Sequence, residues 1–345
     1  APEATAAFGL GGRVLGRRVG WGLGRDARRL VPEFLHRDAG IAVQLIVEPK
    51  YLDVVLLAKL FKQRRRLQQR GDPLRAGCRP AAARPGGVEN AHAQAGDRVV
   101  ELGAGPGFIT KRLAELTDDV VAVEIDSKFQ PLHERLFSTL CVKPQVLYED
   151  ALKVDFGAYV HDLRGRLIVF GNLPYYLTTD LILHAVCQMP NMAHALFMVE
   201  QDVLERLTAS PGSKKYGVLA IVTGLFGHWR LERTVSRHAF IPKPHVTSAL
   251  VSLIPSDDEL YRMRAADPVF LRFLTDIFRY RRKTLSNAIK SSYDCGIGSE
   301  VLERFLTDRG LRRDIRAEQL TPHQFKGLFE SLGQVICHLN GNSVS

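Results

Sequence analysis

The sequence predicts an α/β protein: a parallel sheet covered by helices on both faces, a small all-helical domain after it, and a basic extension before it. Three observations support this prediction. From Asp97 onwards, short apolar runs rich in β-branched residues alternate with helical segments, which is the pattern of a doubly covered parallel sheet. After Pro255 the strand signals stop. The first 32 residues hold six arginines and only two acids.

The size and charge of the chain narrow its class. It has 345 residues, of which 46% are hydrophobic and 24% charged, enough for one large or two modest domains with apolar cores. Collagen-like, disulfide-scaffold and wholly disordered chains are excluded by this composition. The formal net charge of +10 suggests a polyanionic partner, first of all a nucleic acid; the alternative is a basic targeting extension on an ordinary enzyme.

Residues 1–95 are expected to form a basic extension and linker. The arginine-rich, acid-poor start is typical of organelle presequences, so we expect a mitochondrial matrix protein, with a plastid as the alternative. A basic arm that lies on RNA is the other interpretation of the same segment. Residues 50–61 predict a short amphipathic helix, and residues 62–95, interrupted by glycines and prolines, predict a basic and irregular linker.

Seven apolar runs define the strands expected in the central region, residues 96–256. These strands are Arg98–Leu102, Val120–Glu124, Gln145–Tyr148, Leu167–Phe170, Ala195–Val199, Val218–Phe226 and Ser248–Ile254. Helices are expected to begin at Phe108, Ser127 and Thr179, and again after Val199. Residues 268–335 show helical patterns only, which places a helical domain over 257–345.

Two classes of site are not expected. The five cysteines are scattered and form no C-x-x-C pair, so we expect neither a disulfide framework nor a metal site, and a reducing compartment fits best. The longest nearly uninterrupted apolar stretch, Val218–Phe226, is far short of the roughly 20 residues that a membrane-spanning helix needs.

The first predicted strand runs into the glycine-rich segment ELGAGPG, with glycines at Gly103, Gly105 and Gly107. Glycines allow a tight turn and a close approach of the backbone to a ligand. The dinucleotide fingerprint requires glycine at the position of Phe108, and the acidic Glu101 suits a cationic ligand instead. S-adenosylmethionine is such a ligand, because it carries a sulfonium and an ammonium group and no phosphate.

Two further acids support a site for this cofactor. Glu124 ends the second predicted strand about 20 residues beyond the loop, where a carboxylate can accept both ribose hydroxyls. Asp150, followed by Ala151, ends the third strand and could accept from the adenine amino group. Each acid alone could be a helix cap, and Asp126 in particular could cap the next helix. Their order along the chain favours the cofactor site.

The fourth predicted strand ends in the turn Asn172-Leu173-Pro174-Tyr175, which suits methylation of an exocyclic amine. The Asn172 side-chain oxygen and the Leu173 carbonyl could accept the two amino protons, which would aim the nitrogen lone pair at the methyl group. Pro174 would fix the turn, and Tyr175 would stack on the unstacked base. The alternative is a simple turn followed by core aromatic residues.

The chain resembles the KsgA-type ribosomal RNA adenine dimethyltransferases, including the mitochondrial transcription factor B branch. The resemblance covers residues 97–290 well and the tail to about 333 loosely. It is carried by the blocks ELGAGPG, VAVEID, YEDAL, GNLPYY, ERLTASPGSKKYGVLAIVTGLF, AFIPKPHVTSALVSLIP and FRYRRKTLSN. It implies a Rossmann-like class I methyltransferase sheet that dimethylates two adjacent adenines in the terminal hairpin of small-subunit ribosomal RNA, within the assembling small ribosomal subunit.

The resemblance also implies the roles of individual residues. The cofactor positions of the family fall on Glu101, Gly103, Gly105, Gly107, Glu124, Asp150, Ala151 and Asn172. Its catalytic positions fall on Asn172, Leu173, Pro174, Tyr175 and Phe240, the last of which would stack on the other face of the base. Contacts with RNA phosphates are expected from Lys214, Lys215, Lys243, Arg279, Arg281, Arg282 and Lys283. An ordinary solvated helix face is the alternative for this basic set.

Two departures from the family keep alternatives open. The segment Gln-Asn-Phe-Leu-x-Asp, which in the family helps to close over the methionine end of the cofactor, has no counterpart around Arg75–Arg79. Near Asp202 the family more often carries a basic residue. A catalytically weak or inactive assembly factor, or a mitochondrial transcription factor, is therefore the second hypothesis. A resistance methyltransferase acting on large-subunit RNA shares the Asn172 turn, but the N-terminal extension and the block SPGSKKYG argue against it.

Overall fold

The computed structural model describes residues 45–46, 96–241, 245–293 and 299–340. These residues belong to one compact unit, Gln44–Ser345. The expected presequence, the amphipathic helix over 50–61 and the linker over 62–95 lie outside the described residues, and so does Lys243.

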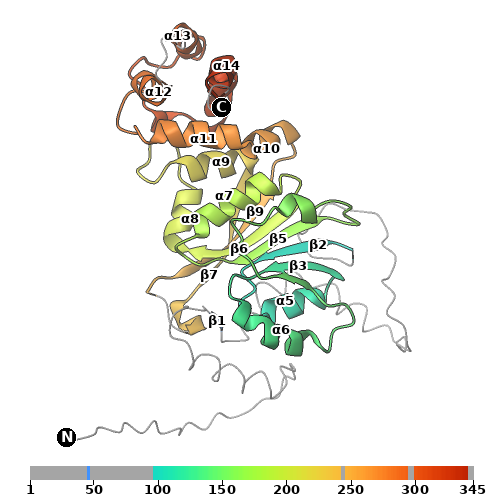
Figure 1. Cartoon of the computed structure of the whole chain (residues 1–345). Helices are drawn as coiled ribbons and strands as arrows, with labels where there is room; N and C mark the ends of the chain where they lie inside the picture. Colours follow the sequence, from blue (N-terminus) through green and yellow to red (C-terminus); the bar gives the residue numbers. More distant parts are fainter. Residues whose placement is uncertain (1–44, 47–95, 242–244, 294–298, 341–345) are drawn as a thin grey trace, which may run out of the picture. The chain divides into compact units, whose positions relative to one another are not determined.

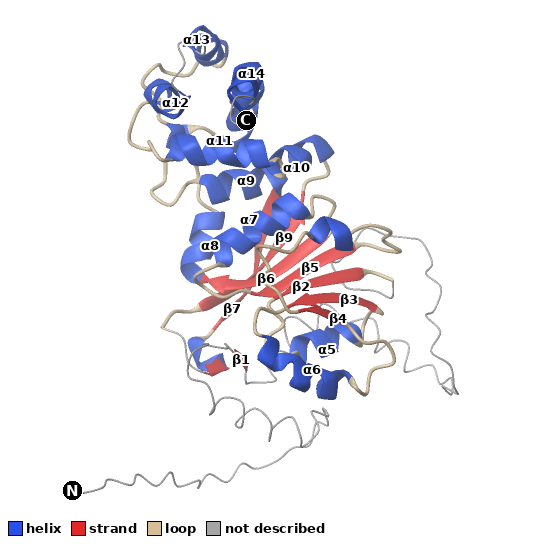
Figure 2. Cartoon of the chain, in the orientation of Figure 1, coloured by secondary structure: helices blue, strands red, loops and turns tan. Residues whose placement is uncertain are grey.

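A seven-stranded mixed sheet forms the centre of the unit, in the order β4-β3-β2-β5-β6-β9-β7 (Figure 2). Its strands are β2 (Arg98–Leu102), β3 (Asp119–Val123), β4 (Gln145–Leu147), β5 (Leu167–Asn172), β6 (His194–Glu200), β7 (Gly227–Val235) and β9 (Ser248–Pro255). The first five strands along the chain pair in parallel, whereas β9 and β7 are antiparallel. The predicted α/β fold class is confirmed, and the sheet is mixed at one edge.

Helices connect and cover the strands. They are α5 (Phe108–Ala114), α6 (Gln130–Phe137), α7 (Thr178–Gln188), α8 (Gln201–Leu207), α9 (Val218–Phe226), α10 (Glu259–Ala265), α11 (Pro268–Phe278), α12 (Leu285–Tyr293), α13 (Ser299–Asp308) and α14 (Pro322–Asn340). Short 3₁₀ turns are η2 (Ser127–Phe129), η3 (Phe156–Tyr159), η4 (Arg237–Ala239) and η6 (Ala317–Gln319). Figure 1 shows α5 and α6 on one face of the sheet and α7 and α8 on the other.

Alternate residues of each strand enter different cores, because successive side chains of a strand point to opposite faces. Val99 belongs to a small cluster on the face covered by α5, together with Leu113 of that helix. Val100 belongs to the large cluster on the opposite face, with Ile182 of α7. Both faces of the central strands are therefore apolar, as their continuous apolar runs predict.

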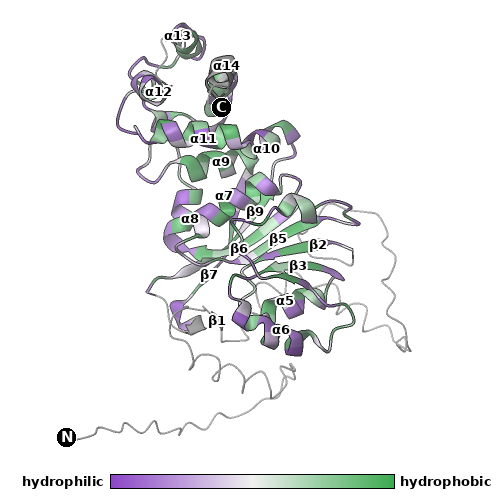
Figure 3. Ribbon diagram, in the orientation of Figure 1, coloured by the Kyte–Doolittle hydropathy of each residue, from purple (hydrophilic) through white to green (hydrophobic). Residues whose placement is uncertain are grey.

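The strand predicted at Val218–Phe226 is wrong: these residues form the helix α9. A short apolar run without polar alternation fits a buried strand and a buried helix equally well. Here the run is surrounded by other helices, since α9 contacts α7, α8, α10, α11 and α14. Burial on nearly every side explains why its helical period is hidden, and the hydropathy colouring in Figure 3 shows α9 as uniformly apolar as the central strands.

The edge strand β7 was not predicted. Its sequence GHWRLERTV alternates half-buried and exposed positions only in part, and a register shift falls between Leu231 and Arg233. Such an irregularity interrupts the period-two pattern by which a strand is recognised in a sequence. Charged side chains on an edge strand also oppose pairing with a further strand.

In the described residues from Glu259 to Asn340 the regular elements are helices, as predicted, and an isolated bridge joins Thr284 and Arg316. The predicted domain boundary at 256 falls between β9 and α10 and stays a prediction. The large apolar cluster does not stop there, because it includes Phe197 of the sheet, Phe226 of α9 and Phe325 of α14. None of the described helices is both long and apolar enough to cross a membrane.

Candidate cofactor and RNA-binding site

The strand order reverses between β2 and β5, because the chain places β3 and β4 on one side of β2 and then returns to add β5 on the other. In open parallel sheets, ligands bind outside the carboxyl ends of the strands at such a switch point. The loops that follow β2 and β5 carry the glycine segment and the Asn172 turn. A Cβ built on Gly103 would lie 3.7 Å from the backbone oxygen of Asn172, so the two predicted motifs meet there.

The glycine loop has the backbone conformation for which only glycine is well suited. The φ angles of Gly103, Gly105 and Gly107 are +81°, +52° and +83°, all in the left-handed region that disfavours other residues. The loop is fixed by its own backbone, because the amide groups of Gly103 and Ala104 both donate to the carbonyl of Val123. Gly107 directly precedes α5, so the start of this helix faces the loop.

Glu124 follows β3 directly and lies beside the glycine loop. It is 8% exposed, and its two carboxylate oxygens accept from the backbone amides of Gly105 at 2.6 Å and Asp126 at 2.9 Å. Each oxygen keeps a second lone pair, so acceptance from ribose hydroxyls remains open. Burial raises the pKa of Glu124, and the two backbone hydrogen bonds oppose that rise. Asp126 caps η2 through the amide of Lys128, as the alternative for this residue predicts.

Glu101 lies almost completely inside the protein, at 1% exposure. Its Oε2 atom is buried and has no hydrogen-bond partner among the described residues. Burial raises the pKa of the Glu101 carboxyl to about 8; hydrogen bonding from the Thr110 side chain opposes this rise, and the charge of Glu124 adds to it. A buried acceptor without a partner is costly unless a ligand supplies a donor or a positive charge. The acidic side chains at this loop therefore fit a cationic cofactor such as S-adenosylmethionine.

Asp150 and Ala151 follow β4 and are both half-buried. Asp150 Oδ1 accepts from the amide of Leu152 at 3.0 Å, which holds the carboxylate in a turn at the end of the strand. Because β4 is the edge strand beside β3, the loops that carry Glu124 and Asp150 follow neighbouring parallel strands. The structure brings the two predicted acids to the same edge of the sheet.

The Asn172 turn leaves the carboxyl end of β5. Asn172 pairs with Met198 of β6, and the Leu173 side chain, 1% exposed, is buried in the core beneath it. The carbonyl of Pro174 accepts from the amide of Leu177 and so closes the turn. Asn172 and Leu173 therefore lie at the carboxyl end of β5, and their catalytic role stays a prediction.

Two tyrosines follow the proline with different surroundings. The Tyr175 hydroxyl lies 2.8 Å from Ser248 Oγ, which ties its ring to the first residue of β9. Tyr176 is 83% exposed. Of these two aromatic residues, Tyr175 is held in place and Tyr176 faces solvent.

Phe240 belongs to the two-residue strand β8 (Phe240–Ile241), which pairs antiparallel with β1 (Leu45–Ile46). Ile46 lies opposite Phe240 in this register. A segment from the N-terminal 95 residues thus pairs with the backbone that carries the predicted second stacking residue. The stacking role of Phe240 stays a prediction.

Among the predicted RNA contacts, distant segments come together. Arg281 Nη2 donates to the carbonyl of Ser213 at 3.0 Å, which places the Arg279–Lys283 turn beside Lys214. Lys214, Arg279, Arg282 and Lys283 are exposed.

Three members of the predicted set pair with acids of the chain, and Arg279 does so through Nη1, which lies 3.2 Å from Asp276 Oδ1. Arg281 Nε lies 2.5 Å from Glu318 Oε2, and Lys215 Nζ pairs with Asp202 and Glu205. The negative charge of Asp202 therefore faces a lysine of the same basic segment. These pairs give Arg281 and Lys215 a structural role besides any RNA contact.

Several residues next to the predicted site were missed. His133 and Tyr148 lie under the glycine loop, and Ser248 holds Tyr175. Their partners are 15 to 73 positions away in the sequence, so no local pattern signals them. On the basic surface, the bridge from Thr284 to Arg316 brings a second arginine-bearing loop beside Lys283.

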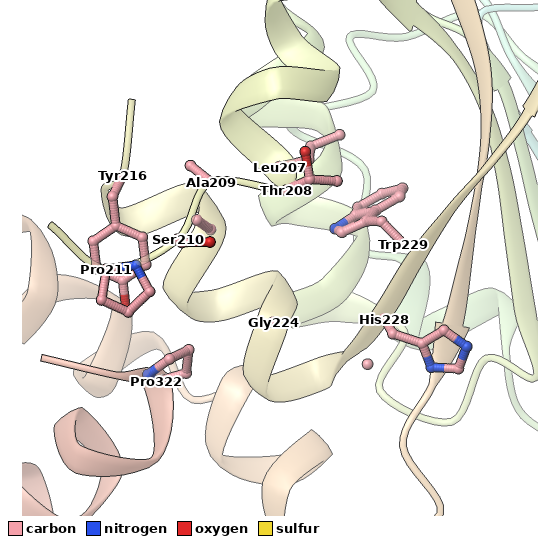
Figure 4. Close-up of a pocket in the computed structure, with 12 residues that line it drawn as sticks. Leu207, Thr208, Ala209, Ser210, Pro211, Tyr216, Gly224, His228, Trp229 and Pro322 are labelled. Atoms are coloured by element: carbon pink, nitrogen blue, oxygen red, sulfur yellow. The ribbon is translucent and has the colours of Figure 1, made fainter. Parts of the chain in front are cut away.

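One cavity in the described part of the chain lies elsewhere. It has a volume of about 240 Å³ and contains none of the predicted site residues. Figure 4 shows Tyr216, Pro211 and Pro322 on one side of it and Trp229 and His228 on the other. Within the described residues, no group of three histidine, cysteine, aspartate or glutamate side chains could hold a metal ion.

The fold and the loops at its switch point define a class I S-adenosylmethionine-dependent methyltransferase. The sequence profile of the ribosomal RNA adenine dimethylase family matches residues 86–334. The chain therefore belongs to this family and is by class an S-adenosylmethionine-dependent rRNA adenine dimethyltransferase.

Individual relatives agree with this family. The chain is 36% identical over 249 residues to a ribosomal RNA small subunit methyltransferase A of Syntrophus aciditrophicus, covering 71% of the chain and 87% of the relative. It is 36% identical over 248 residues to the same-named protein of Deinococcus radiodurans, covering 72% and 80%. Its fold is similar to the crystal structure of a dimethyladenosine transferase from Plasmodium falciparum, with a TM-score of 0.52, 23% identity, and coverage of 68% and 90%.

Proposed function

We propose that this chain dimethylates the N6 amino groups of two adjacent adenines in the 3′-terminal hairpin of small-subunit ribosomal RNA, coupled to assembly of the small subunit in an organelle. The mitochondrial matrix is the proposed compartment, and a plastid is the alternative. The observation that carries the proposal is the meeting of the glycine loop and the Asn172 turn at the switch point of the sheet. The names of the two bacterial relatives support the small-subunit substrate.

In the proposed reaction the Asn172 side-chain oxygen and the Leu173 carbonyl accept hydrogen bonds from the two N–H groups of the adenine amine, and the nitrogen loses one proton to solvent after it has gained the methyl group. This geometry draws the nitrogen away from conjugation with the ring and directs its lone pair toward the cofactor. S-adenosylmethionine supplies an electrophilic methyl group when bound, and its leaving group is a neutral thioether. No strong general base is therefore needed in the turn.

The remaining residues orient the two reactants. Glu101 faces the cationic end of the cofactor, Glu124 accepts from its ribose, and Asp150 accepts from its adenine. Tyr175, held by Ser248, stacks on the target base after that base has left its own stack. The exposed basic residues Lys214 and Arg282 contact RNA phosphates in a manner that depends on salt rather than on sequence.

The test is methyl transfer from labelled S-adenosylmethionine to immature small subunits, followed by mass spectrometry of the 3′-terminal hairpin. The wild-type chain is expected to add the label to the paired adenines, and Asn172→Ala to abolish the transfer. Unchanged turnover in the Asn172 variant would overturn the assignment. If the wild-type protein binds the small subunit but transfers no methyl group, the non-enzymatic assembly factor or transcription factor is the better assignment.

A further inference from the structure

A single histidine lies directly under the glycine loop. His133 of α6 is 2% exposed, and its imidazole is stacked among the rings of Phe129, Phe137 and Tyr148 at centroid distances of 6.1, 5.3 and 5.8 Å. A Cβ built on Gly107 would lie only 2.7 Å from its Cδ2 atom. The imidazole is thus in direct contact with the loop from below and has little room to move.

Both ring nitrogens of His133 have partners. Nε2 lies 2.8 Å from the carbonyl oxygen of Gly105, and Nδ1 lies 2.8 Å from the hydroxyl oxygen of Tyr148. A carbonyl oxygen can only accept, so Nε2 carries the hydrogen. Burial lowers the pKa of His133, so the ring is neutral at physiological pH and Nδ1 accepts from the Tyr148 hydroxyl. The surroundings therefore select one tautomer.

These two hydrogen bonds reach different parts of the nucleoside site. The backbone amide of Gly105 already donates to Glu124, so the Gly105 residue is held at its amide by Glu124 and at its carbonyl by His133. Tyr148 lies two residues before Asp150, at the end of β4. One imidazole thus connects the glycine loop to the loop that carries the second acid.

We propose that His133 is a positioning residue of the cofactor site, which fixes the glycine loop and the Tyr148–Asp150 loop relative to each other. It contacts neither reactant and acts through Gly105 and Tyr148. An apolar residue at this position would fill the space but leave the part-buried Gly105 carbonyl without its donor, and the loop would then shift until water reaches this carbonyl. The inference rests on the proposed function, because it concerns the same cofactor site.

The test compares the affinity of three variants for S-adenosylmethionine and S-adenosylhomocysteine by calorimetry. His133→Leu removes both hydrogen bonds, His133→Gln keeps an amide donor that can reach Gly105, and Tyr148→Phe removes only the hydroxyl. Loss of two buried hydrogen bonds is expected to weaken both ligands about tenfold in His133→Leu. His133→Gln and Tyr148→Phe are expected to lose only about threefold each.

A merely structural role would not give this pattern. In steady-state methyl transfer, His133→Leu is expected to raise KM for S-adenosylmethionine while kcat at saturating cofactor stays within about twofold. The matched control is His194→Leu, which removes another buried histidine, 7% exposed, at the amino end of β6 and thus at the opposite edge of the sheet. It is expected to lower the melting temperature without changing either affinity.

The proposal is overturned if His133→Leu binds both ligands like the wild type, if His133→Gln is no better than His133→Leu, or if the loss falls on kcat alone. Should His133→Leu fail to fold, Tyr148→Phe decides: an unchanged affinity refutes the proposal. Because the calorimetric affinities need no RNA, they can be measured independently of the proposed function. A wild-type protein that binds the cofactor but leaves rRNA unmethylated would refute only the latter.

Discussion

The hydroxyl of Tyr175 lies 2.8 Å from Oγ of Ser248, and Ser248 is completely buried. The two residues are 73 positions apart and belong to the Asn172 turn and to the antiparallel strand β9. One hydrogen bond therefore sets the orientation of the ring proposed to stack on the target base. The antiparallel edge of the sheet contributes to the site through this contact.

Tyr175→Phe and Ser248→Ala should reduce kcat/KM for RNA by similar amounts. Each removes the same hydrogen bond, whose net worth is about 1 kcal/mol, or about fivefold. The double variant should lose less than the sum of the two single losses, because both substitutions remove the hydrogen bond that joins the two residues. Steady-state kinetics on immature small subunits measures all three. Fully additive losses would show that the two residues act independently.

Gly107→Ala and Gly212→Ala provide a matched pair at the glycine loop. Both glycines have φ +83°, so alanine brings a similar backbone strain of about 1–2 kcal/mol at either position. At Gly107 the new methyl group also meets His133 at 2.7 Å and Phe137 at 3.0 Å, whereas nothing lies within 4 Å at Gly212. Gly107→Ala should therefore abolish cofactor binding in calorimetry, and Gly212→Ala should leave it unchanged. Equal affinities would contradict the close contact.

Glu101 should make the stability of the ligand-free protein depend on pH. Its folded pKa of about 8 lies above the ordinary value of 4.5, so the folded state holds a proton that the unfolded state releases between these values. The stability that the protonated Glu101 contributes is complete below pH 4.5 and is lost as the pH rises to 8. Over this range the free energy of unfolding falls by at most about 1.4 kcal/mol per pH unit. Urea unfolding at pH 6, 7 and 8 should show a shallower decline in Glu101→Gln. If the unfolding free energies of the wild type and Glu101→Gln fall equally with pH, the raised pKa of Glu101 is refuted.

Cofactor binding should release a proton from Glu101 near neutral pH. A cationic ligand favours the carboxylate form, which is the minority form while the pKa stays at about 8. Calorimetry at pH 7 in two buffers with different ionisation enthalpies measures this release directly. The released fraction should fall in Glu101→Gln, and an equal release in both proteins would assign the proton to another group.

Arg281 and Arg282 should separate stability from RNA binding. Arg281 pairs with Glu318 and donates to Ser213, so Arg281→Ala and Glu318→Ala should both lower the melting temperature. Arg282 is exposed, and Arg282→Ala should leave the melting temperature unchanged while reducing the salt slope of RNA binding by about one. Binding measured across a salt series tests this, and identical slopes would remove Arg282 from the phosphate contacts.

Much of the fold could be predicted because local patterns and packing agree along the first five strands. Four of these strands are short, apolar and followed by an α-helix, so period and length point to one structure, whereas β4 is followed only by the 3₁₀ turn η3. For α9 they do not agree, because this run of nine residues, seven of them buried, carries no period that separates helix from strand. For β7 the irregular register and the charged edge weakened the strand pattern.

The candidate site divides in the same way. Residues such as Glu124 and Asn172 follow strands directly, and their place at the sheet edge could be foreseen from chain order alone. His133 and Ser248 act through single hydrogen bonds to residues 28 and 73 positions away, which depend on the folded packing. The roles of these two residues can be assigned only once the folded structure shows their hydrogen-bond partners.

The helix α9 has a consequence for how the protein can vary. It contacts helices from both halves, α7 and α8 beside the sheet and α10, α11 and α14 beyond it. Its side chains belong to the one large apolar cluster that extends from the sheet to α14, so we expect the sheet and the helices after it to unfold as a single cooperative unit. A chain shortened after β9 would expose the apolar side chains of this helix. It should therefore lose stability as well as the proposed contacts with RNA. Substitutions in the helices after β9 should therefore also change the free energy of unfolding of the sheet that carries the proposed methyl-transfer site.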